Sequence, residues 1–235
     1  MSAPATLELR SARKVFFPGT VNEVVALREI DLVVPAGQFV TMIGSNGSGK
    51  STMLNAVAGT FRLSAGRVLL DDRDISKQPE HVRSRLIGRV FQDPRAGTAP
   101  SMTIEENLAL ALMRSARSGL RRGVTNRRRD LMRAQLSRLG MGLEDRLRAQ
   151  VLKLSGGQRQ AMSLLMATIA EPGLLLLDEH TAALDPKVAG TIMELTEAIV
   201  TERALTTLMV THNMEIALRH GDRLIMMHAG RIVLD

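Results

Sequence analysis

Gly44-Ser-Asn-Gly-Ser-Gly-Lys-Ser51 follows a short apolar stretch, 38–43, and leads into a stretch, 51–58, with the composition of a helix. A glycine-rich loop between a strand and a helix turns backbone N–H groups inward, where they bind phosphate. Lys50 is expected to contact the β- and γ-phosphates of a nucleotide, and the Ser51 hydroxyl to bind Mg²⁺. An ordinary glycine-rich turn is the alternative, which the flanking strand and helix disfavour. The residues expected to hold the nucleotide are Gly44, Ser45, Asn46, Gly47, Ser48, Gly49, Lys50, Ser51 and Thr52.

A second stretch, Leu174-Leu-Leu-Leu-Asp178-Glu179, predicts a strand that is covered on both faces and ends in two carboxylates. In parallel sheets, ligands gather at the carboxyl ends of the strands. Asp178 is therefore expected to bind Mg²⁺ through a water, and Glu179 to orient and polarise an attacking water. The alternative is a buried strand that ends in two surface acids.

The third motif, Leu154-Ser-Gly-Gly-Gln158, predicts the start of a helix with Ser155 as its N-cap. Gly156 and Gly157 leave backbone N–H groups exposed at that helix start, which favours a second phosphate site. The loop 44–51 already serves the nucleotide of this chain. We therefore expect the third motif, including Gln158, to face a nucleotide held by a partner chain.

The remaining pattern alternates strands with helices, which is typical of a parallel sheet covered by helices. The apolar and β-branched runs that predict further strands are 6–10, 24–34, 38–43, 66–70, 87–92, 205–210 and a terminal hairpin over 224–234. We expect a single domain over 1–235, with a nucleotide-binding core formed by 1–92 and 159–235.

Helix signals replace strand signals between the second and third motifs. Thr103-Ile-Glu-Glu106 is a capping box that opens one helix through about 115, and a second helix is predicted over 126–139. We interpret 93–158 as a helical subdomain that is inserted into the core and carries the third motif.

Together these motifs resemble those of an ATP-binding-cassette (ABC) ATPase, and the likeness covers essentially the whole chain. Residues 44–51 match the Walker A loop, 154–158 the signature motif and 174–178 the Walker B strand, in the family's order and spacing. The resemblance implies an α/β fold of the P-loop NTPase (RecA-like) class. That fold has a core with a parallel sheet, an N-terminal antiparallel β-subdomain and an inserted α-helical lobe.

Three further positions match residues that the family uses in catalysis or dimerisation. Gln92 matches the Q-loop glutamine, implied to bind Mg²⁺ or water and to report the γ-phosphate to the helical lobe. His212 matches the switch histidine, implied to contact the γ-phosphate and help Glu179 hold the water; a histidine that only caps a helix is the alternative. Asp185 matches the D-loop and is expected both to cap a helix at Pro186 and to contact the partner chain. The implied catalytic set is Glu179, His212, Gln92 and Lys50.

Members of the family stack adenine on an aromatic residue upstream of Walker A. Phe16 stands at the matching position, with Phe17 as a possible substitute and a purely structural role for both as the alternative. The chain departs from the family at His180, where a proline is common. We expect a neutral loop residue there; an added phosphate or cross-dimer contact is the alternative.

The resemblance also implies partners. Two chains, most simply two copies, would pair head to tail around two ATP molecules with Mg²⁺. The stretches 88–95 and 178–186 resemble those of bacterial importer subunits, which work with integral membrane permeases and an extracytoplasmic substrate-binding protein, in some cases for amino-acid uptake. The implied location is the cytoplasmic face of the cell membrane, reached through the permease.

Bulk composition fits this expectation. Hydrophobic residues make up 45% of the 235-residue chain, cysteine is absent, and no apolar run approaches the roughly 18 residues needed to span a bilayer. The first residues lack the basic-then-apolar order of a signal peptide. The sequence therefore predicts a protein that reaches a membrane only through a partner.

The net charge of +7 leaves another function class open, a cassette ATPase acting on DNA or ribosomes. Its support is an arginine cluster, which consists of Arg114, Arg117, Arg121, Arg122, Arg127, Arg128, Arg129 and Arg133. A solvated helix face, or a surface near anionic lipid headgroups, explains the same cluster. Against nucleic acid stands the absence of tryptophan and tyrosine, since bases stack on exposed aromatic rings. No nucleic-acid partner is expected.

Overall fold

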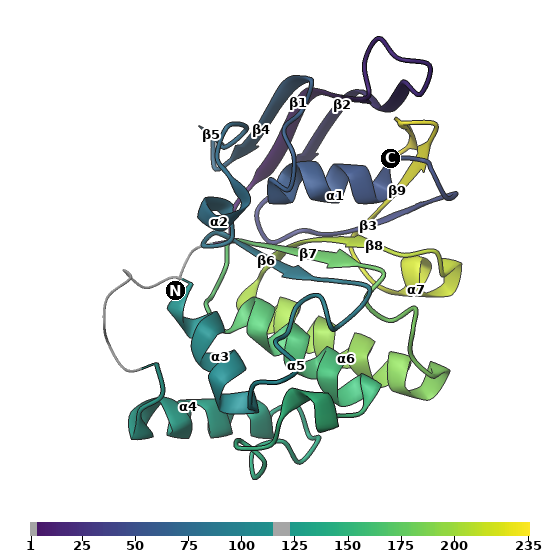
Figure 1. The fold of residues 1–235 in the computed structure, drawn as a ribbon. Helices are drawn as coiled ribbons and strands as arrows, with labels where there is room; N and C mark the ends of the chain where they lie inside the picture. Colours follow the sequence, from purple (N-terminus) through teal and green to yellow (C-terminus); the bar gives the residue numbers. More distant parts are fainter. Residues whose placement is uncertain (1–3, 115–122) are drawn as a thin grey trace.

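The computed structural model describes residues 4–114 and 123–235, which form two β-sheets and several layers of helices (Figure 1). The strands are β1 (Leu7–Phe16), β2 (Val24–Val34), β3 (Phe39–Gly44), β4 (Ala65–Leu70), β5 (Arg73–Asp74), β6 (Ile87–Val90), β7 (Leu174–Asp178), β8 (Thr206–Val210), β9 (Arg223–His228) and β10 (Arg231–Leu234). The helices are α1 (Lys50–Ala58), α2 (Glu80–Arg83), α3 (Ile104–Met113), α4 (Asn126–Ser137), α5 (Gly156–Thr168), α6 (Pro186–Arg203) and α7 (Met214–Arg219), with a 3₁₀ turn at Val151–Lys153.

The six-stranded sheet has the order β10-β9-β3-β8-β7-β6, and all its pairs except the β9–β10 hairpin are parallel. Its register aligns Val210 at the end of β8 with Met42 on one side and Asp178 on the other. The carboxyl ends of β3, β8 and β7 therefore meet at one edge of the sheet. The segments that follow these strands carry three of the sequence-predicted functional stretches.

The four-stranded antiparallel sheet, β2-β1-β4-β5, lies above the first sheet, and α1 lies between the two (Figure 1). Met53, Leu54 and Val57 of α1 are fully buried in the core that the two sheets share. The predicted strand 6–10 was too short. β1 continues to Phe16 because it pairs along its length with β2, past register shifts near Ser11, which adopts a positive φ of 44°.

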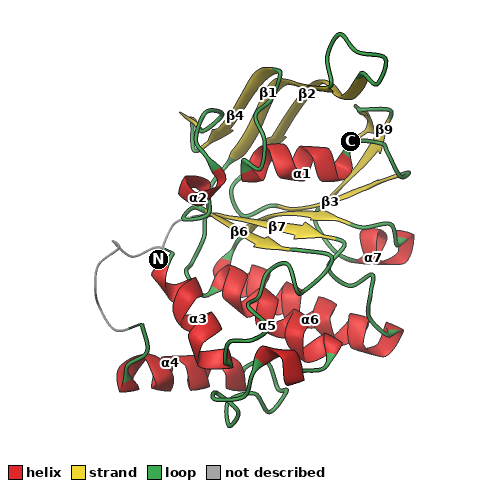
Figure 2. Cartoon of the chain, in the orientation of Figure 1, coloured by secondary structure: helices red, strands yellow, loops and turns green. Residues whose placement is uncertain are grey.

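Helices cover the opposite face of the six-stranded sheet (Figure 2), with α5 and α6 against the strands and α3 and α4 outside them. The predicted capping box is confirmed, since the Thr103 N–H donates to Glu106 Oε2 at 2.7 Å and the Glu106 N–H donates back to Thr103 Oγ1. α3 ends at Met113, and the end predicted near 115 lies outside the described residues. With these helices the predicted fold class, an α/β core with an antiparallel β-subdomain and an inserted helical lobe, is confirmed.

Arg83, at the end of α2, is a buried cation that joins the antiparallel sheet to α1. Its side chain is 1% exposed and donates hydrogen bonds of 2.8–2.9 Å to the carbonyls of Ser76, Gln78, Ala56 and Val57. Two of these carbonyls belong to the last turn of α1, where the helix dipole favours positive charge.

No helix within 4–114 and 123–235 is long and apolar enough to cross a membrane.

Candidate active site

A cavity of about 480 Å³ opens at the carboxyl edge of the six-stranded sheet. Residues from five regions line it: the end of β1, the first half of β2, the loop after β3 with the first turn of α1, the segment after β7, and the turn between β9 and β10. We call it the phosphate-loop cavity. Its lining includes Phe16, Asn46, Gly47, Ser48, Gly49, Lys50, Ser51, Thr52 and Glu179.

The loop 44–51 curls tightly because its glycines permit backbone conformations that other residues avoid. Gly49, the residue before α1, has φ +106°, and a Cβ there would lie 2.7 Å from the Ala26 carbonyl oxygen. Lys50 Nζ donates to the carbonyls of Gly44 at 2.7 Å and Ser45 at 3.0 Å. The buried Ser48 hydroxyl has no hydrogen-bond partner. A cation and an unsatisfied hydroxyl that face a ring of backbone groups are what an anionic ligand would complete.

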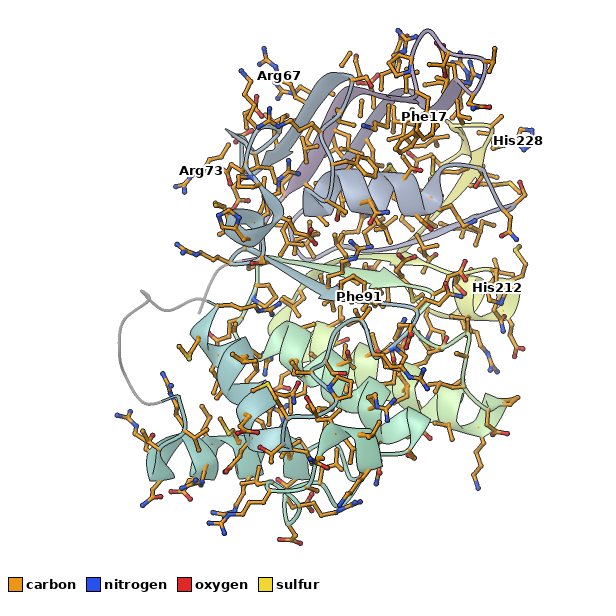
Figure 3. The ribbon with its side chains drawn as sticks, in the orientation of Figure 1. Phe17, Arg67, Arg73, Phe91, His212 and His228 are labelled. Atoms are coloured by element: carbon orange, nitrogen blue, oxygen red, sulfur yellow. The ribbon has the colours of Figure 1, made fainter. Side chains whose placement is uncertain are left out.

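An aromatic wall closes one side of the cavity. The Phe16 ring packs edge-to-face against Phe61, with centroids 5.3 Å apart, and Lys14 Nζ lies 4.8 Å from the Phe16 centroid. Phe17, the alternative that the sequence left open, is 65% exposed and is not among the lining residues (Figure 3). Of the two neighbouring phenylalanines, Phe16 has the position that suits stacking on a base.

Asp178 ends β7 with its side chain mostly buried. Burial raises the pKa of this carboxyl above its usual value, and the Arg89 guanidinium, 3.3 Å from Oδ2, opposes that rise. The sequence analysis missed Arg89. The register offers the one signal that would have found it: Arg89 pairs with Leu176, two residues before Asp178, so both side chains lie on the same face of the sheet.

Glu179 and His212 meet beside the cavity. The His212 Nδ1–H donates to Glu179 Oε2 at 3.2 Å, because an ionised carboxylate only accepts. Glu179 has a positive φ of 44°, and its N–H donates to the Val210 carbonyl at 2.9 Å, so the end of β8 holds this strained residue in place. Its carboxylate is mostly buried, whereas His212 is exposed at the edge of the molecule (Figure 3).

Gln92 follows β6 and is exposed. The strand it follows is the neighbour of β7, yet the described residues that line the phosphate-loop cavity do not include Gln92. This conformation does not bring Gln92 together with the other predicted catalytic residues.

The signature motif also lies apart from the cavity of its own chain. Ser155 and Gln158 form a reciprocal capping box at the start of α5, with both N–H···O distances 3.2 Å. Gly157 is required by packing, because a Cβ there would lie 2.4 Å from Val188 Cγ1 of α6. Asp185 caps α6 by accepting from the Lys187 N–H, and it remains exposed. Ser155, Gly156 and Asp185 are therefore exposed on the surface, whereas Gly157 is buried against α6.

His180 lies in the turn after β7, as the sequence predicted, but its side chain is in the interior. Its ring is 2% exposed, and its Nε2–H donates to the Thr196 hydroxyl at 3.2 Å, since that hydroxyl itself donates to the Ile192 carbonyl. Burial lowers the pKa of His180 from 6.5 to about 4. The imidazole is thus neutral at physiological pH, as expected, but it anchors the segment after Glu179 to α6 and makes no surface contact.

This burial predicts an acid-sensitive fold. Above pH 6.5 His180 is neutral whether the chain is folded or unfolded. Its protonation therefore does not change the free energy of unfolding in that range. As the pH falls from 6.5 to about 4, the unfolded chain binds a proton that the folded chain does not. The free energy of unfolding should fall by about 3 kcal/mol over this range through His180 alone.

Urea unfolding at pH 7.5 and pH 4.5 measures this effect. The His180→Gln variant should lose less stability on acidification than the unsubstituted chain, whereas a change at the exposed His228 should leave the pH dependence unaltered. Equal acid sensitivity of the His180→Gln variant and the unsubstituted chain would contradict the assignment.

The arginine cluster does not form one uniform surface within the described residues. Arg114 donates to the Met166 carbonyl at 2.9 Å, and Arg129 pairs with Glu105 at 2.7 Å. Arg117, Arg121 and Arg122 lie outside the described residues. Arg114 and Arg129, two of the five cluster members within the described residues, serve the packing of the helical lobe, which weakens the case for a nucleic-acid surface.

Comparison with known proteins gives consistent results. The family model described as "ABC transporter" matches residues 27–182. A tyrosine transport ATP-binding protein of Clostridioides difficile is 45% identical over 230 residues, which cover 97% of this chain and 91% of that protein. A sulfate/thiosulfate import ATP-binding protein of Chromobacterium violaceum is 37% identical over 227 residues, 97% of this chain but 60% of that longer protein.

Solved structures agree. A dimeric ATP-binding cassette in a post-hydrolysis state, bound to ADP and phosphate, aligns with a TM-score of 0.83 at 29% identity, covering 97% of both chains. A nucleotide-free cassette from an ABC transporter aligns with a TM-score of 0.81 at 25% identity, covering 98% of this chain and 90% of that one.

Proposed function

This chain belongs to the ABC transporter family, as an ATP-binding and ATP-hydrolysing cassette, and we propose that it powers a bacterial importer for an amino acid. The observation that carries the proposal is the convergence of the phosphate loop, Glu179 and His212 at one edge of the parallel sheet. The substrate class rests on the 45% identity to a tyrosine transport ATP-binding protein, which this chain matches over nearly its full length.

The site fits a nucleotide with Mg²⁺. The Ser48 hydroxyl and the Lys50 ammonium face the cradle that would hold the phosphates, and Phe16 would stack on the base. Mg²⁺ is commonly held by one or two protein oxygens together with phosphate oxygens and waters. The Ser51 hydroxyl and the Asp178 carboxylate, on adjoining elements, supply such oxygens, and Gln92 would join them if the segment after β6 moved inward. Bound there, the ion would neutralise charge on the β- and γ-phosphates.

Glu179 would act on the water that attacks the γ-phosphate. Its carboxylate lines the phosphate-loop cavity and accepts from His212, which fixes one oxygen and leaves the other for the water. His212, exposed at the mouth, would donate to the γ-phosphate from its other ring nitrogen. Hydrolysis of ATP to ADP and phosphate then requires no covalent intermediate with the protein.

A second copy of the chain would complete each site. In one chain the signature motif lies away from the cavity, with Ser155, Gly156 and Asp185 exposed. A head-to-tail pair with two-fold symmetry would bring those N–H groups to the partner's nucleotide. The dimeric state of a solved relative supports this arrangement.

A groove of about 420 Å³ runs between the core and the helical lobe, and we call it the inter-lobe groove. Its walls include Arg89, Phe91, Leu110, Arg114 and Met166, and the Leu110 side chain is 50% exposed. An apolar groove between two layers suits an apolar segment of a permease, and this would place the chain at the cytoplasmic face of the membrane. An extracytoplasmic substrate-binding protein would complete an importer.

Co-purification from detergent-solubilised membranes, with MgATP present, tests the proposal. The tagged chain should retain a polytopic membrane protein. Leu110→Asp should lose that partner, while Leu131→Asp, which changes an exposed leucine of α4 outside the groove, should keep it. Absence of a membrane partner in every nucleotide state would refute the transporter assignment, and recovery of nucleic acid alone would favour the other function class.

A further inference from the structure

Arg89 joins two elements that would supply the magnesium ligands. Its Nη2 group donates to Asn55 Oδ1 at 2.7 Å and to Asp178 Oδ2 at 3.3 Å, so one nitrogen bridges α1 and β7. Both partners of the ion pair with Asp178 are mostly buried, at 12% and 15% side-chain exposure. A charged contact shielded in this way holds its geometry far better than a solvent-exposed pair.

The contact of Arg89 with α1 lies close to Ser51, the residue of α1 that would bind the ion. Asn55 lies four residues after Ser51, and residues four apart share one face of a helix. Fixing Asn55 therefore also fixes the distance from the Ser51 hydroxyl to the Asp178 carboxylate. Because Arg89 occupies only Oδ2, the other carboxylate oxygen is left for an ion.

The other side of the same guanidinium faces the inter-lobe groove. Its central carbon lies 4.5 Å from the centroid of the Phe91 ring, and both Arg89 and Phe91 line that groove. Figure 3 shows Phe91 between the six-stranded sheet and the helical layer. The buried Arg89 Nε has no hydrogen-bond partner, so the stack on Phe91 and a bond of 3.4 Å from Nη1 to the Thr60 hydroxyl orient the rest of the guanidinium.

We propose that Arg89 is a positioning residue that sets the separation of the two magnesium ligands and links that separation to the inter-lobe groove. The proposal rests on the proposed function, because it assumes that Ser51 and Asp178 bind the ion of a bound nucleotide. A segment bound in the groove would press on Phe91 and shift the guanidinium that stacks on it. That shift would move the Asp178 carboxylate relative to the Ser51 hydroxyl. Arg89 itself is not among the residues that line the phosphate-loop cavity.

Manganese binding tests the positioning role without relying on hydrolysis. The full chain is saturated with ADP, Mn²⁺ is added, and the EPR signal of free Mn²⁺ gives the affinity. Arg89→Gln should weaken Mn²⁺ binding by about 10–100-fold, as loss of a group that orients a metal ligand typically does. Asn55→Ala should weaken it in the same direction, and this second variant keeps the test valid if Arg89→Gln does not fold.

Two controls separate this role from a purely structural one. ADP affinity in EDTA should be unchanged in both variants, since the phosphate loop is intact.

Phe91→Ala should also weaken Mn²⁺ binding, whereas Leu110→Ala, which changes the groove without touching Arg89, should not. Unchanged Mn²⁺ affinity in Arg89→Gln, or an equal loss of metal-free ADP binding, overturns the positioning role. Unchanged affinity in Phe91→Ala overturns the link to the groove, and failure of the unsubstituted chain to bind ADP refutes the proposed function instead.

Discussion

Glu179→Gln is expected to abolish nearly all ATP hydrolysis while MgATP remains bound. Glutamine keeps the size of the side chain and one oxygen, but it cannot polarise a water as a carboxylate does. Loss of such a group typically slows a reaction by about 10²–10⁴-fold. The variant should therefore stay in an ATP-bound dimer and elute earlier from a gel-filtration column than the chain in ADP.

Phosphate release and gel filtration with MgATP measure the two parts of this prediction. Glu194→Gln is a matched control, because Glu194 lines the neighbouring pocket that also includes Glu179 and His212, yet it does not line the phosphate-loop cavity. That control should hydrolyse ATP at the unsubstituted rate. Full activity in Glu179→Gln would remove Glu179 from the role we assign it.

Arg83→Met is expected to lower the free energy of unfolding by several kcal/mol, because each buried acceptor that loses its donor costs about 1–3 kcal/mol. Methionine fills much of the volume but leaves four carbonyl oxygens without their donors. Gly59, which follows α1, packs against the same side chain, because a Cβ at that position would lie 2.8 Å from Arg83 Nε.

Equilibrium urea unfolding gives this number directly. Arg85→Met, the same change two residues later at an exposed position, should alter stability by no more than about 0.5 kcal/mol. Arg83→Lys should fall between the two, since it keeps the charge with fewer donors. If Arg83→Met and Arg85→Met have equal stability, the buried network contributes nothing measurable.

Local chemistry explains which features the sequence predicted well. Thr103 and Ser155 start helices because their hydroxyls accept from backbone N–H groups three residues on. All the residues of such a capping box lie within four consecutive positions, so the sequence alone indicates it. The same holds for Asp185 before Pro186 and for the four leucines of β7, which only a strand covered on both faces would carry.

Long-range contacts explain what was missed. Arg83 and Arg89 look like ordinary surface arginines in the sequence, and only the packing of distant elements shows that their partners are carbonyls of α1 and the carboxylate of Asp178. The burial of His180 within its loop was not predicted, because nothing near it in the sequence indicates that α6 covers it. The length of β1 likewise depends on two partner strands, β2 and β4, rather than on its own residues.

The position of Phe16 has a practical consequence for spectroscopy. The chain contains neither tryptophan nor tyrosine, so its intrinsic fluorescence in the near ultraviolet is very weak. Phe16→Trp would place a single indole on the wall of the phosphate-loop cavity, against Phe61 and beside Lys14. The tryptophan fluorescence of the variant would then report on the phosphate-loop cavity alone. Its change with time would follow nucleotide binding, hydrolysis and product release.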